Sequence, residues 1–124
     1  MAEITNTQNK SHYDLEERTF KFARDCRAYI AKLPKIIANI EDGKQLTRSS
    51  GSVAANYIEA NEAVSKKDFV LRIKICRKEA KESRLWLMLC ETHKDKVLVK
   101  KQERLIQEAT ELMKIFGSIV EKSK

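Results

Sequence analysis

The sequence predicts an all-α protein, an antiparallel up-down four-helix bundle. In four segments apolar side chains recur at alternating spacings of three and four residues, as on one face of a helix. The 124 residues include only three glycines and one proline, which leaves little room for long loops or many tight turns. No segment shows the polar and apolar alternation of a half-buried strand. Long helices with short links pack antiparallel at shallow crossing angles.

The first helix follows a polar stretch without periodicity, residues 1–10, which we expect to be a flexible N-terminal tail. The bundle domain is therefore assigned to residues 11–124. Ser11 and Asp14 have the spacing of a capping box and are expected to open the helix. Its predicted core face consists of Leu15, Thr19, Phe22, Cys26, Tyr29 and Leu33. Pro34 ends it.

The second helix has an uncertain start, because residues 34–44 fit either a loop or a loosely helical lead-in. From about Asp42 a core face resumes, with Leu46, Ser50, Val53, Tyr57, Ala60 and Val64. Six of the nine residues from Arg48 to Asn56 are Ser, Gly or Ala, and small side chains let another helix approach closely. We therefore expect a close helix crossing at Gly51, which would offset its cost of about 1 kcal/mol within a helix.

The third and fourth helices have the clearest patterns. Ser65 and Asp68 form a second capping box. The core face that follows consists of Phe69, Ile73, Cys76, Ala80, Ser83, Leu87 and Cys90. After a link near residues 92–95, one heptad line consists of Leu98, Leu105, Leu112 and Ile119, and a second of Val99, Ile106, Met113 and Val120. One bundle core could fill both lines, but we take the second as support for self-association.

The three cysteines, Cys26, Cys76 and Cys90, are odd in number and show no CxxC spacing. Free core thiols in a reducing compartment are the better interpretation. No apolar leader opens the sequence, and no apolar run approaches the roughly 20 residues that span a bilayer. We expect a cytoplasmic protein.

Reactive groups are not clustered in this sequence. His12 and His93 are expected to face solvent, and Glu79 and Glu82 lack the histidine that a di-iron ExxH pair needs. No HExxH or glycine-rich phosphate loop occurs. We predict a protein that is not an enzyme, with no catalytic residues, no metal and no cofactor.

Charge is distributed unevenly along the chain. Residues 1–64 carry nine basic and nine acidic side chains, whereas residues 65–124 carry sixteen basic and nine acidic ones, which is the entire net charge of +7. A basic half beside a neutral half favours contact with phosphate or another polyanion, although a solvated face is the alternative. The expected contacts are Lys67, Arg72, Lys74, Arg77, Lys78, Lys81, Arg84, Lys94, Lys96, Lys100 and Lys101. Aromatic side chains that could stack on bases are scarce, so phosphate contacts with weak sequence preference are expected.

A set of polar residues lies at helical spacing on the second and third helices. Its members are Arg48, Ser49, Ser52, Asn56, Glu59, Asn61, Glu62, Glu79 and Glu82. A satisfied polar layer that fixes helix register is the simpler interpretation, because partly buried carboxylates need partners. The alternative is a ligand or RNA contact from Asn56 or Glu59.

The segment RSSGSVAANYIEANEAVSKKDFVLRIKICRKEAKESRLWL, which begins at Arg48, resembles the four-helix-bundle proteins encoded in intervening sequences of bacterial 23S ribosomal RNA genes. That family shows an Arg-Ser-x-x-Ser-(Ile/Val)-x-x-Asn-(Tyr/Ile)-x-Glu-Ala segment, matched from Arg48 to Ala60. A Ser-Lys-Lys-Asp-Phe cap follows from Ser65, and a Lys-Glu-x-x-Glu-(Ser/Thr)-x-x-Trp-Leu segment corresponds to Lys78–Leu87 with one acid shifted. The resemblance implies a left-handed bundle, often a ring-like homopentamer. It also implies kinship with accessory proteins of diversity-generating retroelements, which look like basic barrels that bind nucleic acid and a reverse transcriptase.

Two functions remain open at this point. The first is a homo-oligomeric protein that binds nucleic acid, RNA over DNA, through its basic face. The alternative is an adaptor bundle that docks a protein partner, with no nucleic-acid role. A fold family alone does not decide between them.

Overall fold

The computed structural model describes residues 6–124, with side chains described from Leu15 onward. This part of the chain forms four α-helices and no strand: α1 (Asn6–Lys32), α2 (Ile37–Asn61), α3 (Lys66–Leu89) and α4 (Lys96–Lys122). The predicted all-α fold with four helices is confirmed.

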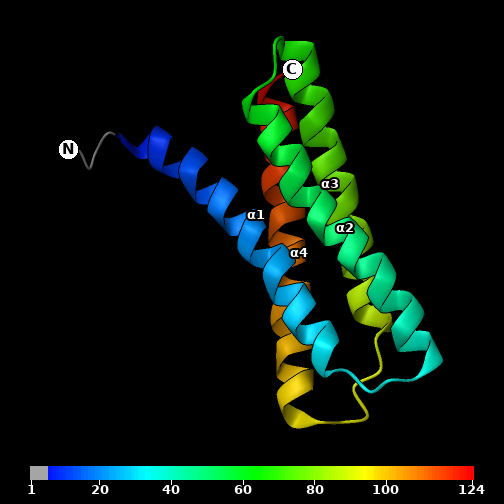
Figure 1. The fold of residues 1–124 in the computed structure, drawn as a ribbon. Coiled ribbons are helices and arrows are strands. Elements are labelled where there is room, and N and C mark those ends of the chain that lie inside the picture. The colour runs from blue at the N-terminus through cyan, green and yellow to red at the C-terminus, as the bar shows by residue number, and fades with distance from the viewer. Residues whose placement is uncertain (1–5) are drawn as a thin grey trace.

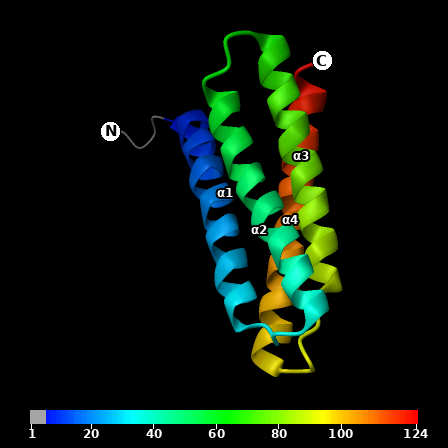
Figure 2. The ribbon, with the colours of Figure 1, turned by 45° about the vertical axis from the view of Figure 1, so that its right-hand side comes forward.

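Each helix packs against its neighbours along the chain, and α1 also packs against α4. Within the described residues the diagonal pairs, α1 with α3 and α2 with α4, have no backbone contact. In Figure 1 the chain reverses direction at each link. Figure 2 shows α1, α2 and α3 side by side, with α4 behind them. The outer faces of α2 and α3 are therefore neighbours on one side of the molecule.

The first two helices begin earlier than the sequence predicts. α1 begins at Asn6 and passes through Ser11, where we expected it to start. The side chains of Ser11, His12 and Asp14 lie outside the described residues. α1 ends at Lys32, close to Pro34 as expected. α2 already begins at Ile37, so most of the uncertain stretch is helical, although Ile36 at its N-cap provides no capping side chain.

The other two helices have polar N-caps. The Ser65 hydroxyl accepts a hydrogen bond from the backbone N–H of Asp68 at 3.0 Å, so the predicted cap of α3 is confirmed. Asp95 caps α4 by accepting from the N–H of Leu98 at 3.0 Å.

All residues of the predicted core faces except Val64 are buried or partly buried, and Leu15, Phe69 and Ile119 are among the partly buried ones. The residues forming the core cluster include Phe22, Cys26, Tyr29, Leu46, Val53, Tyr57, Ile73, Cys76, Leu87, Leu105, Leu112 and Phe116. Val64 was wrongly assigned to the core: it follows the end of α2 and is 94% exposed. Val120 is buried, and Ile106 and Met113 pack partly buried against the core. The second heptad line of α4 is thus largely used inside its own bundle, and it loses its value as evidence for self-association.

All three cysteines are free and buried. Burial raises the pKa of the Cys90 thiol to about 11 and the pKa values of Cys26 and Cys76 to about 12. Thiols that stay protonated in an apolar core react slowly. Their role in this fold is packing.

Gly51 does not lie at a close helix crossing, so that expectation is wrong. A Cβ atom added there would lie 3.2 Å from Nη2 of Arg27, at the tip of a flexible side chain. The fully buried small residues of this stretch are Ser49 and Ser50. Gly43 is the tighter position, because an added Cβ would lie 3.1 Å from Cγ2 of Ile30, a stiff β-branched side chain.

We therefore expect Gly51→Ala to stabilise the protein by up to about 1 kcal/mol, because alanine is the better helix former and Arg27 can move aside. Gly43→Ala serves as the contrast and should gain less, since Ile30 must shift. Urea denaturation of both variants measures the difference. A loss of stability for Gly51→Ala would show that the position of Arg27 is fixed.

Candidate nucleic-acid interface and the polar seam between α2 and α3

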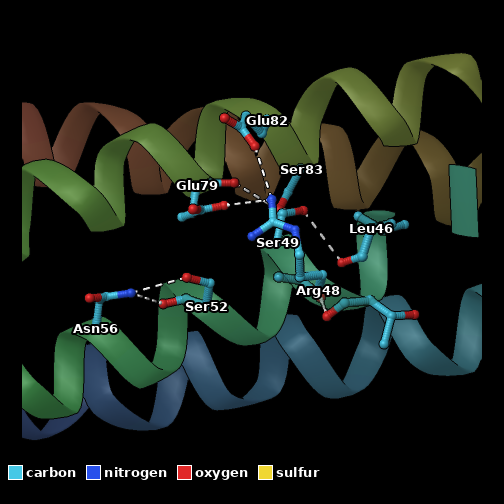
Figure 3. Close-up of polar contacts among 10 residues, drawn as sticks. Leu46, Arg48, Ser49, Ser52, Asn56, Glu79, Glu82 and Ser83 are labelled. Atoms are coloured by element: carbon cyan, nitrogen blue, oxygen red, sulfur yellow. Dashed lines mark hydrogen bonds and ion pairs between the residues drawn. The ribbon is translucent and has the colours of Figure 1, made fainter. Parts of the chain in front are cut away.

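A polar seam joins α2 to α3. Its centre is Arg48, whose Nη2 lies 3.2 Å from Oε1 of Glu79 and 3.1 Å from Oε1 of Glu82. Figure 3 shows the guanidinium reaching from α2 to both carboxylates of α3. The Glu79 side chain is only 8% exposed, so its charge depends on this contact.

The seam continues on both sides of Arg48. The hydroxyls of Ser49 and Ser83 lie 2.7 Å apart, with both residues fully buried. Asn56 donates to the carbonyl and hydroxyl of Ser52, and its Oδ1 accepts from Arg72 at 3.1 Å. Through Ser49–Ser83 and Asn56–Arg72, these contacts extend the polar connection between α2 and α3 beyond Arg48.

Three members of the predicted polar set lie outside the seam. Asn61 donates to Glu16 of α1 at 3.3 Å. Glu59 and Glu62 are exposed, and neither carboxylate forms an ion pair with a side chain of the described residues. Helical spacing in the sequence does not distinguish the exposed carboxylates of Glu59 and Glu62 from the paired carboxylates of the seam.

The basic residues of α3 lie mostly on its outer surface. Lys67, Lys74, Lys78 and Lys81 are exposed. Arg77 lies toward α4, beside Gly117, where an added Cβ would be 3.7 Å from its Nε. Seven residues on, Arg84 occupies nearly the same side of the helix and is half-buried, with a buried Nε that no described group accepts from.

The charges of α3 are sorted by side. Its acids, Asp68, Glu79 and Glu82, contact only arginines of the seam, Arg48 and Arg72. None of the seven other cations of α3 has an ion-pair partner within the described residues. These unpaired cations are Lys66, Lys67, Lys74, Arg77, Lys78, Lys81 and Arg84. Arg72, also expected as a nucleic-acid contact, instead holds Asn56 in the seam.

The remaining expected contacts form a separate group. Lys94 has a left-handed backbone in the α3–α4 link, with φ 62°, and Lys96 and Lys100 are exposed at the start of α4. Lys101 is half-buried. Exposed apolar side chains lie between this group and the basic residues of α3: Leu85, Met88 and Leu89.

Sequence analysis missed the ion pairs between α1 and α4. Arg18 donates through two nitrogens to Glu108, at 2.7 and 2.9 Å, and to Glu111 at 2.8 Å. These contacts raise the pKa of the guanidinium, while Gln107 and Arg18 together lower the pKa of Glu111. Since the partners are about 90 residues apart in sequence, no local pattern identifies them. Three cations and three acids line the adjacent groove of about 440 Å³, which gives it no net charge.

Within the described residues, no group of three or more His, Cys, Asp or Glu side chains converges as metal ligands do. No helix found there combines the length and apolar character needed to cross a bilayer. The part of the chain with distinctive geometry is thus the seam and the unpaired basic surface beside it.

The seam predicts a specific stability defect. Arg48→Ala should cost about 1–3 kcal/mol, because it leaves the buried carboxylate of Glu79 without a partner. Adding Glu79→Gln should recover part of the loss, since a neutral amide costs less to bury. Glu82→Ala is the control: its carboxylate is 37% exposed, and the loss should stay below about 1 kcal/mol. Urea unfolding of the four proteins gives these values, and equal losses for Arg48→Ala and Glu82→Ala would contradict the assigned role.

Comparison with known proteins agrees with this architecture. Residues 11–118 match the family described as 23S rRNA-intervening sequence protein. A solved structure from Bacteroides thetaiotaomicron, described as a protein with unknown function from the S23 ribosomal protein family, superposes with a TM-score of 0.69 at 28% identity. The match covers 86% of this chain and 97% of that one. Comparison with curated proteins gives no match. The family match spans the seam, the basic surface and most of the four helices, and the chain belongs to the 23S rRNA-intervening sequence protein family.

Proposed function

We propose that this chain is a non-enzymatic protein of the cytoplasm that binds nucleic acid, RNA in preference to DNA, through the phosphates. The single observation that carries the proposal is the sorting of charge on α3. Its acids contact the arginines of the seam, while its seven other cations have no ion-pair partner among the described residues. Unpaired cations in a row attract a polyanion and release its counterions on binding.

The five cations used for binding form a ridge, defined as Lys67, Lys74, Arg77, Lys81 and Arg84. Their spacings of 7, 3, 4 and 3 residues run along the outer surface of α3 at Lys67, Lys74 and Lys81 and along its α4 side at Arg77 and Arg84. At a rise of 1.5 Å per residue the ridge is about 25 Å long, enough for several phosphates of one strand. Membership in an rRNA-associated family supports RNA as the polyanion.

We also propose that the bundle is left-handed and that the chain self-associates into a ring-like assembly, with a pentamer favoured. The family resemblance is the support for the number five. Exposed apolar residues on α2 and α3 support self-association itself, among them Ile37 at 81% and Leu71 at 54% exposure. The same residues favour the second candidate function, an adaptor that docks a protein partner.

The ridge is tested by replacing Lys74, Arg77, Lys81 and Arg84 with Gln, which keeps helix propensity almost unchanged. The slope of log Kd against log salt for a structured RNA should flatten by about 0.7–0.9 for each lost phosphate contact. Affinity should fall by similar factors for unrelated sequences, because phosphates carry little base information. Filter binding across a salt series, with thermal melting to verify folding, provides both readouts.

The matched control replaces Lys32, Lys35 and Lys44 with Gln. All three are exposed cations on the neutral half of the chain, and Lys44 already pairs with Glu41 at 3.3 Å. Equal weakening by both sets would show that binding is not localised to the ridge. If neither set matters, the adaptor function replaces the nucleic-acid one.

The assembly predicts a mass well above 14.3 kDa at micromolar concentration, measured by light scattering after nuclease treatment. Nuclease treatment matters because bound RNA would itself add mass. A nuclease-treated protein that stays at 14.3 kDa would refute self-association while leaving the ridge untouched.

A further inference from the structure

α3 carries a second apolar stripe that its own bundle does not cover. Leu71 and Leu89 lie 18 residues apart, which is five helical turns and thus the same side of the helix. Between them, Ile75 follows Leu71 by four residues and Leu85 precedes Leu89 by four. Leu71, Leu85 and Leu89 are each about half exposed, whereas the residues of the core stripe on the opposite side are buried. A helix on the surface of a soluble protein rarely exposes such an apolar stripe unless another molecule covers it.

α2 carries a comparable stripe on its outer side. Ile37 and Ala55 are five turns apart, and so are Ile40 and Ile58. Between these apolar ends the same side carries Lys44 and Arg48, both already held in ion pairs. Exposure is 81% for Ile37, 44% for Ile40 and 48% for Ile58. The first turns of this helix even invert the usual polarity, because Asn39 is buried at 3% exposure while the isoleucines around it face outward.

The α2 stripe also borders a hollow. A groove of about 240 Å³ between α1 and α2 is lined by apolar side chains that include Ile30, Leu33 and Ile40, with Lys35 and Lys44 also among its lining residues. Apolar side chains from another helix could enter it.

The two stripes have unpaired charges of opposite sign. On α3, Lys78 and Glu82 occupy the middle of the stripe and Lys81 lies beside it. Glu82 pairs with Arg48, whereas neither lysine has an ion-pair partner in the described part of the chain. On α2, Glu59 and Glu62 follow Ile58 and are likewise exposed without one. Acidic and basic groups that flank complementary apolar strips set the partner and the orientation of packed helices.

We infer that the α3 stripe of one copy docks on the α2 stripe of the next copy. Opposite charges on two different surfaces of the same chain favour a second copy as the occupant. Because the two surfaces differ, the contact is heterologous, and its repetition closes into a ring or continues as a filament. This inference rests on the proposed self-association and names the surfaces that form it. The ridge overlaps this contact at Lys67, five turns from Leu85, and at Lys81, whereas Arg77 and Arg84 lie toward α4 and stay available to RNA.

Charge reversal tests the pairing. Lys78→Glu with Lys81→Glu should weaken self-association at least about tenfold, because like charges then face each other across the contact. Glu59→Lys with Glu62→Lys should do the same. The chain that carries all four substitutions has complementary charges again and should associate like the parent. An equimolar mixture of the two double variants should form contacts only between unlike copies, which gives pairs and even-numbered assemblies but no closed ring of five.

Sedimentation velocity of the nuclease-treated proteins measures these outcomes. Parent protein that is monomeric refutes self-association and this contact together. If the parent is oligomeric but the fourfold variant is as weak as either double variant, the pairing of these stripes is wrong and self-association stands. The inference is also wrong if the lysine variant loses association while the Glu59→Lys with Glu62→Lys variant keeps it, because the glutamates would then have no role in the contact.

An uncharged pair of variants guards against a misfolding artefact. Leu71→Gln with Leu89→Gln should abolish association and keep the circular dichroism spectrum, because both side chains are about half exposed in the single chain. Val97→Gln, at a position 64% exposed outside both stripes, should leave association unchanged. Association that survives the leucine change overturns the inference. If the protein is an adaptor, the unsubstituted chain should stay monomeric, and its α3 should bind an acidic amphipathic helix of another protein.

Discussion

The burial of the Glu79 carboxylate against Arg48 is the constraint on which the alignment of α2 and α3 depends. A charge that is 8% exposed is tolerated only while a cation stays within hydrogen-bond distance. Sliding α3 along α2 by one turn would move Glu79 about 5 Å from the guanidinium and would separate the buried hydroxyls of Ser49 and Ser83. Apolar contacts alone would tolerate such a shift more easily, because they have no direction. The seam therefore supplies the specificity, and the core supplies most of the stability.

That same constraint leads to the charge pattern of the outer surface. Glu79 and Glu82 are held toward α2 by Arg48, so they are unavailable to neutralise the lysines on the far side of α3. A chain with nine acids in its basic half could have paired most of its cations locally. Because the acids of α3 contact the arginines of the seam, the cations on the other sides of α3 stay unpaired. Structural specificity and the proposed binding of a polyanion are thus two results of one arrangement.

The four helices and their core faces were predictable from sequence because each helix has six or seven core residues that recur at spacings of three and four. The seam was partly predictable, since Arg48, Ser49 and Asn56 are close in sequence and of unusual composition. The inverted polarity of the first turns of α2 was not predictable. The buried amide of Asn39 donates to the carbonyls of Pro34 and Glu91, and Glu91 is distant in the sequence. The contact of Arg18 with Glu108 joins distant segments and leaves no local pattern. A second stripe on α3 was readable in the sequence, at Leu71, Ile75, Leu85 and Leu89, but the stronger core stripe obscured it.

Asn39 has a consequence for how the bundle opens. Its amide donates to the carbonyls of Pro34 and Glu91 and accepts from the N–H of Glu91, so one side chain joins the α1–α2 link to the α3–α4 link. Local unfolding at this end therefore has to release both links together, which raises its free energy. The opposite end has a single link within the described chain, from Glu62 to Ser65, without a clamp of this kind. Amide hydrogens near the α2–α3 link should consequently exchange with solvent earlier than those near Asn39, and the bundle frays from one end.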